Sequence, residues 1–178
     1  MGLNLTKSLV YFDIEATGLS ISKDRIIEIA FLKIHPDQSE ERKTWRVNPQ
    51  IPIPDHTYQI HGISDDDVKD SPLFKDVAKE IVSFIGNADL AGFNVLKFDL
   101  PMLVEELLRV DEDLDLSKRK VVDVQRIYHK MEQRNLRAAY KFYCDKNLDN
   151  AHSADADTQA THEVLEAQVE KYEELKND

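Results

Sequence analysis

The chain has 178 residues, a length that suits one domain with its own hydrophobic core. Its composition, 42% hydrophobic and 32% charged with only 5 Gly and 6 Pro, excludes a fibrous or disordered protein, and its net charge of −11 argues against tight, sequence-independent nucleic-acid binding. No apolar run could span a bilayer, so no membrane association is expected, and the single cysteine, Cys144, cannot form an internal disulfide. We therefore expect a cytoplasmic protein.

The first fifty residues contain three apolar segments that predict strands. Residues 8–16 mix Leu, Val, Tyr, Phe and Ile, as buried strands do. A second strand is expected at 25–34 and a third at 42–49, where Asn-Pro stops it. Because the gaps between these segments are short, we expect antiparallel hairpins.

Beyond residue 60, segments with helical periodicity alternate with short apolar segments. Helices are predicted at 64–68, 74–86, 100–108 and over most of 125–145 and 153–175. Short strands are predicted at 88–94 and 120–124. This order predicts an α/β fold with a mixed sheet, its first three strands antiparallel and its later strands entered through helical crossovers. We expect residues 1–178 to form one domain, with a core at about 8–175.

Two acidic residues, Asp13 and Glu15, stand inside the first predicted strand. Side chains alternate along a strand, so both lie on one face, about 6.6 Å apart. At an effective dielectric constant near 20, two charges at about that distance repel by roughly 2.5 kcal/mol. The pair is harmless at the wet end of a strand, and otherwise needs a proton, a basic partner or a cation. Because no basic residue lies within several positions, a site for a hard divalent cation is favoured.

Two later acids could complete such a site. Asp99 stands where a strand gives way to a helix, and Asp157 stands near the start of the last predicted helix. Each has an ordinary alternative, Asp99 as a helix N-cap and Asp157 as a favourable charge for the helix dipole. His152 precedes Asp157 by five residues, a spacing that is poor for one helix face, so we expect it on the preceding loop or first turn, near the same site.

Four segments resemble the motifs of the DEDD superfamily of 3′–5′ exonucleases. They are FDIEATGL from residue 12, HGIS from 61, GFNVLKFDLPML from 92 and AHSADAD from 151. A His five positions before the last Asp is typical of the DEDDh branch, which includes the proofreading subunit of bacterial replicative polymerases. The resemblance covers residues 8 to about 165, almost the whole chain.

The resemblance implies a ribonuclease-H-like fold, with a central five-stranded mixed sheet flanked by helices. It implies two divalent cations, Mg²⁺ or Mn²⁺, held by four carboxylates: Asp13, Glu15, Asp99 and Asp157. It implies His152 as the general base. It further implies a set of residues around the terminal nucleotide: Thr17, Gly18, Leu19, His61 and Phe98.

The second motif departs from the commonest family pattern in two ways. It reads GFNV where many members have a His before the Asn, and three residues separate Asn94 from Phe98 where two are commoner. Asp99 still follows the Phe. These departures bear on substrate preference more than on the chemistry.

The function implied is metal-dependent release of nucleoside monophosphates from the 3′ ends of single-stranded DNA, in proofreading or repair. The alternative is the same chemistry on short or structured RNA, because the choice depends on how the pocket meets the 2′-OH. A non-catalytic binding module would be expected to lose an acid or the His, and all five are present. A structural Ca²⁺ protein would be expected to carry an EF-hand-like loop, and the sequence has none.

The negative charge is compatible with this function, because bound cations supply positive charge and an enzyme that grips a few terminal nucleotides needs few phosphate contacts. A polymerase or other processivity partner is a candidate to act beside the chain. Four basic residues would share one face if 125–145 formed a single helix: Lys130, Arg134, Arg137 and Lys141. They are either a solvated face or a guide for single strands, and a helix break near Asn135 would separate them.

Overall fold

The computed structural model describes residues 3–149 and 153–177, and the chain divides into two compact units. The first unit is Met1–Gln125 and the second is Arg126–Asp178. Each unit is described by itself. Along the described ranges, none of the helices is both long enough and apolar enough to cross a membrane.

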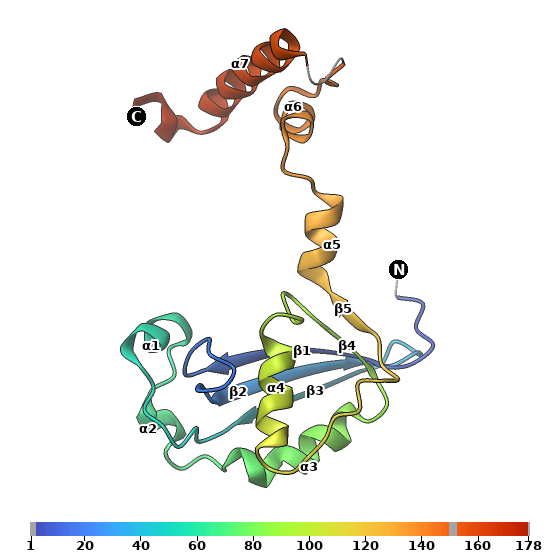
Figure 1. Ribbon diagram of the computed structural model, residues 1–178, viewed down its shortest axis with the longest axis vertical. Coiled ribbons are helices and arrows are strands. Elements are labelled where there is room, and N and C mark those ends of the chain that lie inside the picture. The colour runs from blue at the N-terminus through green and yellow to red at the C-terminus, as the bar shows by residue number, and fades with distance from the viewer. Residues whose placement is uncertain (1–2, 150–152, 178) are drawn as a thin grey trace. The chain divides into compact units, whose positions relative to one another are not determined.

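The first unit is built on one five-stranded mixed sheet (Figure 1). Its strands are β1 (Leu9–Ala16), β2 (Ile26–Ile34), β3 (Glu40–Arg46), β4 (Asp89–Gly92) and β5 (Val121–Asp123). The order across the sheet is β3-β2-β1-β4-β5. The first three strands are antiparallel, whereas β4 pairs parallel with both β1 and β5. The predicted fold class is therefore confirmed.

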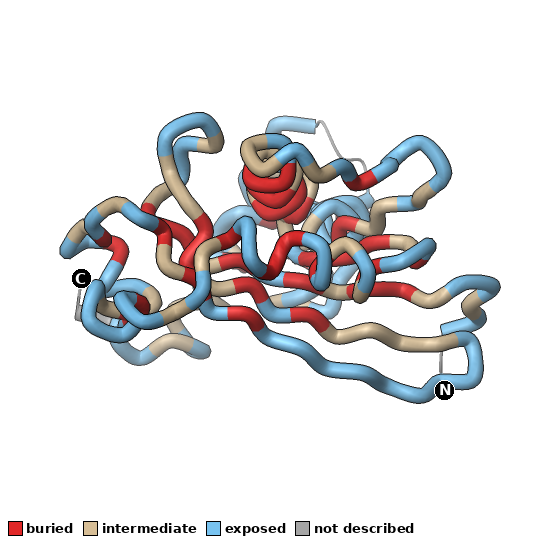
Figure 2. Tube along the Cα trace, turned by 90° about the horizontal axis from the view of Figure 1, so that it is seen from below, coloured by how far each residue is buried: buried red, intermediate tan, exposed pale blue. Residues whose placement is uncertain are grey.

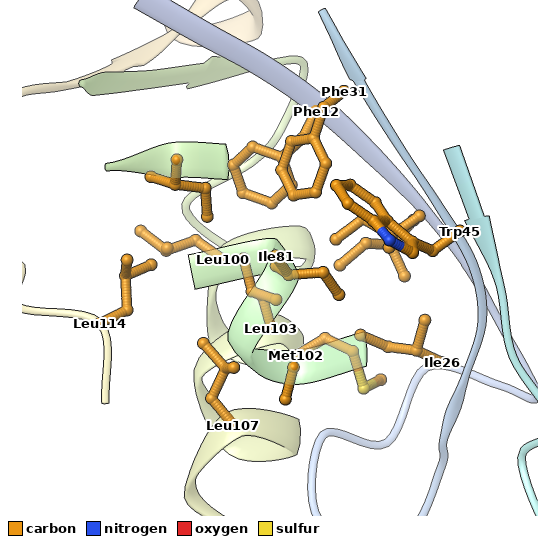
Figure 3. Packing of buried hydrophobic residues seen from close by; sticks show 14 of the residues in the cluster. Phe12, Ile26, Phe31, Trp45, Ile81, Leu100, Met102, Leu103, Leu107 and Leu114 are labelled. Atoms are coloured by element: carbon orange, nitrogen blue, oxygen red, sulfur yellow. The ribbon is translucent and has the colours of Figure 1, made fainter. Parts of the chain in front are cut away.

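One face of this sheet is covered by helices α3 (Phe74–Ile85) and α4 (Asp99–Leu108). Alternate residues of β1 point into that layer and are buried: Val10, Phe12, Ile14 and Ala16. Figure 3 shows the rings of Phe12, Phe31 and Trp45 in the same packed space as Ile81 of α3 and several leucines of α4. This core fixes which face of β1 looks away from α3 and α4.

The intervening residues of β1, including Asp13 and Glu15, lie on the opposite face. Within the first unit Asp13 is exposed and Glu15 is half-buried, whereas their neighbour Ile14 is only 5% exposed. The alternation of buried and exposed segments is visible along the strands in Figure 2. The period of two that the sequence predicted for this strand is thus realised in its burial.

Two local features of the first unit differ from the predictions. Helix α1 (Asp55–His61) was not predicted, because its seven residues are too few for a clear apolar period. Its ends carried signals all the same, since Pro54 precedes it and Gly62 follows it in the left-handed conformation. The third strand begins and ends earlier than expected. Helix α2 (Asp65–Val68) begins as predicted, with a capping box between Ser64 and Asp67.

The second unit contains α6 (Leu136–Cys144), α7 (Ala154–Lys171) and the 3₁₀ helix Glu173–Asn177, preceded by α5 (Val124–Met131). A small core joins α6 to α7, formed by Tyr140, Leu148, Ala160 and Val164. Tyr140 Oη also donates a hydrogen bond of 2.9 Å to Glu163.

The four basic residues between 130 and 141 do not lie on one helix. Helix α5 ends at Met131. Asn135 is the N-cap of α6, and its side chain accepts a hydrogen bond from Ala138 N. Arg134 therefore stands between two helices, and Lys130 belongs to a different helix from Lys141. Residues 125–145 therefore do not form the single helix that a shared basic face requires. The proposed role of these residues in guiding single strands is withdrawn.

We predict that Gly92→Ala lowers the free energy of unfolding by about 2 kcal/mol, as overpacking of a buried site does. A Cβ at Gly92 would lie 3.0 Å from the carbonyl oxygen of Phe12 and 2.9 Å from Cβ of Val95. The first of these atoms is backbone and cannot move without shifting β1. Urea titration of the two proteins measures the change, and equal midpoints would contradict it. Gly62→Ala is not a suitable control, because Gly62 has a positive φ.

Candidate active site

The site is built where β1 loses its parallel neighbour. Strand β4 pairs with β1 only as far as Tyr11, after which Gly92 ends β4 and Asn94 turns the chain with a positive φ of 61°. The rest of β1, which carries Asp13 and Glu15, has β2 on one side and, among the residues described, no strand on the other. Its backbone N–H groups on that side need another acceptor.

Asp99 supplies that acceptor. It is the first residue of α4 and is 4% exposed, and its Oδ1 accepts a hydrogen bond of 3.0 Å from the backbone N–H of Ile14. Ile14 stands between Asp13 and Glu15, so this bond brings a carboxylate from 85 residues away to the two acids of β1. The ordinary N-cap role is not the one observed, because Phe98 occupies the N-cap position of α4.

The three carboxylates interact electrostatically. The pKa of Asp99 is raised to about 6, first by burial and then by the neighbouring negative charges of Asp13 and Glu15, while the hydrogen bond from Ile14 N lowers it. Burial raises the pKa of Asp13. Burial also raises the pKa of Glu15, aided by Asp13 and opposed by His61. In the part of the chain that is described, no Lys or Arg forms an ion pair with any of the three.

The turn that delivers Asp99 is held by a residue that sequence reasoning missed. Asp123, at the end of β5, is buried and accepts hydrogen bonds from the backbone N–H groups of Asn94 (3.0 Å), Leu96 (3.3 Å) and Gln125 (3.1 Å). A buried Asp directly after a short apolar strand was the available signal. By binding the 94–96 backbone, Asp123 fixes the longer turn that distinguishes this motif.

A pocket of about 170 Å³ opens beside Glu15. It includes four residues that the resemblance assigned to the substrate: Gly18, Leu19, His61 and Phe98. Helix α1 contributes three that the sequence did not indicate: His56, Thr57 and Ile60. Leu19 and Ile60 are 83% and 80% exposed, so the pocket presents apolar residues to solvent at its mouth.

Thr17, the fifth assigned residue, does not line this pocket. It is 1% exposed, donates through Oγ1 to Asp24 at 2.9 Å and accepts from the backbone N–H of Arg25 at 3.0 Å. Its side chain therefore holds the loop between β1 and β2. A Cβ on Gly18 would lie 2.5 Å from the same Asp24 carboxylate, so a side chain there would displace that carboxylate.

His61 presents an unpaired donor within the pocket lining. Its Nδ1 accepts a hydrogen bond of 3.1 Å from the backbone N–H of Ile63, which places the proton of the neutral ring on Nε2. That Nε2 is buried, and among the described residues it has no hydrogen-bond partner. A buried donor without an acceptor is costly unless a ligand supplies one.

The remaining predicted residues belong to the second unit. Asp157 is half-buried in the first turn of α7, and its Oδ1 is buried with no hydrogen-bond partner among the residues described. His152 lies outside the described residues. The structure therefore brings together three of the predicted metal ligands, Asp13, Glu15 and Asp99, within one unit.

The donors suit a hard divalent cation. In the first unit the donors are the oxygens of three carboxylates that repel one another. In the second unit, one oxygen of Asp157 is buried and has no hydrogen-bond partner among the described residues. Within the described ranges no three His, Cys, Asp or Glu side chains already converge into a cage. Within the first unit, Asp13, Glu15 and Asp99 would be the ligands of such a cation.

Comparisons with known proteins identify the family of the chain. Residues 10–165 match the model of the RNase T exonuclease family. The chain is 31% identical over 173 residues to the PolC-type DNA polymerase III of Caldanaerobacter subterraneus, and 30% identical over 166 residues to that of Bacillus subtilis. These matches cover 97% and 89% of the chain, but only 12% and 11% of the two polymerases.

Solved structures show the same fold. Escherichia coli exonuclease I in complex with a dT13 oligonucleotide matches 92% of the chain and 41% of its own, with a TM-score of 0.62 and 18% identity. A zinc-bound form of that enzyme with single-stranded DNA matches 94% of the chain and 41% of its own, with a TM-score of 0.63 and 19% identity. The expected ribonuclease-H-like fold is thus confirmed. With the family model spanning both units and the DEDD motifs at its core, the chain belongs to the RNase T exonuclease family, within the DEDD superfamily of 3′–5′ exonucleases.

Proposed function

We propose that the chain removes nucleoside monophosphates from the 3′ ends of single-stranded DNA with two divalent cations, Mg²⁺ or Mn²⁺. The observation that carries the proposal is the bond from Ile14 N to Asp99 Oδ1, which sets a third carboxylate beside Asp13 and Glu15. These three and Asp157 would hold the cations. Two such ions supply charge stabilisation at the attacking and leaving oxygens of phosphodiester hydrolysis.

The protein groups divide the remaining work. His152 takes a proton from the attacking water, which an imidazole with a pKa of about 6.5 can do near neutral pH. The unpaired Nε2–H of His61 donates to an oxygen of the terminal nucleotide. Leu19 and Phe98 pack against its sugar and base, because both belong to the apolar pocket beside Glu15. Thr17 acts on the substrate only through the loop it holds.

The proposed setting is DNA proofreading or repair in the cytoplasm, beside a polymerase. It is supported by the PolC-type polymerases, whose much longer chains match this one over most of its length. Single-stranded DNA is favoured as substrate because the exonuclease I structures that share the fold are complexes with DNA oligonucleotides.

An end-labelled oligonucleotide panel tests the proposal. We expect 5′-labelled single strands to shorten stepwise in Mg²⁺ or Mn²⁺. They should remain intact in EDTA, because EDTA removes the cations that stabilise charge on the reacting oxygens. Matched DNA and RNA strands in the same assay decide the sugar preference. A labelled mononucleotide as the first product of a 5′-labelled strand, or degradation that is unchanged by EDTA, would refute the mechanism.

A further inference from the structure

Glu106 is a charged residue buried inside the first unit, outside the pocket and the carboxylate group. It is 1% exposed and lies two turns after Asp99 on α4. Its carboxylate binds two guanidinium groups. Arg25 Nε lies 2.5 Å from Oε1 and Arg25 Nη2 lies 3.2 Å from Oε2, while Arg109 Nη1 lies 2.7 Å from Oε1.

Both arginines are joined to the loop that connects β1 to β2, residues 17–25. Arg25 ends this loop, and its backbone pairs with Thr17 through the bond from Thr17 N to Arg25 O, 2.9 Å long. Arg109 reaches the loop from α4, donating to the carbonyl oxygens of Asp24 and Ile21, each at 3.1 Å. The C-cap residue of α4 thus binds two separate points of a loop more than 80 positions earlier.

The same loop carries the wall of the pocket. Gly18 and Leu19 line the pocket, and the Asp24 carboxylate closes the loop behind them by accepting from Thr17 Oγ1 and from Ser20 N. Movement of Asp24 would therefore move Gly18, against which its carboxylate is packed. The position of Gly18 and Leu19 in the pocket wall therefore depends on the position of Asp24.

Helix α4 connects the two parts of the site. Asp99 and Glu106 are seven residues apart, so they lie on one face of the helix, and both are buried. The first is bonded to β1 between the acids and the second to the pocket loop through two arginines. One rigid helix therefore sets the distance between the carboxylates and the pocket wall.

We propose that the Arg25–Glu106–Arg109 group, which we call the loop clamp, is a positioning device for the 3′-terminal nucleotide. None of its three residues lines the pocket, so its effect on substrate passes through Gly18 and Leu19. The proposal rests on the proposed exonuclease function. A buried ion pair is weak evidence of stabilisation, because it can often be exchanged for apolar residues without loss of stability.

The test is steady-state kinetics of Glu106→Gln on a single-stranded DNA oligonucleotide in Mn²⁺. We expect KM to rise about tenfold, the scale of a lost charged hydrogen bond, with kcat within about threefold of the unsubstituted protein. Calorimetric titration with Mn²⁺ alone should give an unchanged affinity, because Asp13, Glu15 and Asp99 are untouched. Thymidine 5′-monophosphate should bind more weakly by about the same factor as the change in KM.

A second variant keeps the test decisive if Glu106→Gln does not fold. Arg109→Lys retains a positive charge for Glu106 but lacks the planar fork that reaches both loop carbonyls, so it should raise KM in the same direction. The matched control is Glu80→Gln, which removes the negative charge that faces Lys43, although an amide oxygen can still accept from Trp45 Nε1. Glu80 belongs to α3 and contacts β3, not the loop, so this variant should leave KM unchanged. An unaltered KM in either folded clamp variant overturns the clamp. An unsubstituted protein that degrades no strand overturns the proposed function instead.

Discussion

Asp99→Asn is expected to lower exonuclease turnover by about 10³-fold or more while the protein stays folded. An amide oxygen can still accept the hydrogen bond from Ile14 N, so the tie between α4 and β1 survives. What disappears is a negative ligand among the three carboxylates. Initial rates on a 5′-labelled oligonucleotide, with circular dichroism to verify the fold, measure the effect.

The control for this substitution is Asp76→Asn. Asp76 also stands in the first turn of a helix and accepts a backbone hydrogen bond, from Leu73 N at 3.0 Å, but it belongs to α3 and not to the site. It should retain full activity. Equal activity in both variants would remove Asp99 from the catalytic group and leave it as an anchor of α4.

Asp99→Asn should also be more stable than the unsubstituted protein in EDTA at neutral pH. The pKa of Asp99 is raised from 3.8 to about 6, so folding disfavours its ionised form. The penalty is absent below about pH 4, grows as the pH rises toward 6 and is complete above that value. Asn cannot ionise, so the stability difference should favour the variant by about 1–2 kcal/mol at pH 7.5 and shrink at pH 5. A pH-independent difference would contradict this origin.

His152→Ala is expected to lower kcat by about 10²–10⁴-fold, the usual range for loss of a general base. Mn²⁺ affinity should change little, since the proposed ligands are carboxylates. The acidic limb of the pH–rate profile should also flatten, because the group that must lose a proton is gone. Stopped-time assays across pH 5.5–9, with calorimetric titration of Mn²⁺, test both expectations.

The matched control is His162→Ala. His162 is in the same unit, on α7, with a 61% exposed side chain that lies 3.6 Å from Glu166. It should leave kcat and the pH profile unchanged. If His162→Ala reproduced the loss and His152→Ala did not, the assignment of the base would be wrong.

The strands and most helices could be predicted because their signals are local. The burial of β1 follows from alternation in one segment, and α3 follows from Phe74, Val77, Ala78, Ile81 and Ile85 at helical spacing. Helix α1 could not be predicted with the same rule, because seven residues hold too little periodicity. The break at 132–135 was foreseen only as a condition, since Asn135 fits both a helix interior and an N-cap.

From the sequence alone, apolar alternation and helical spacing gave the α/β fold class, because these patterns are properties of neighbouring residues. The exonuclease family and the four candidate carboxylates followed from the resemblance of its motifs to the DEDD superfamily. Only the tertiary structure decided that Asp99 binds the backbone between Asp13 and Glu15, that Thr17 faces Asp24 instead of the pocket, and that Glu106 joins α4 to the pocket loop. Thr17 meets Asp24 through the fold of the loop that contains both, and the contacts of Asp99 and Glu106 depend on where α4 lies against the sheet. The packing of many apolar side chains sets that position, and no short stretch of sequence contains it.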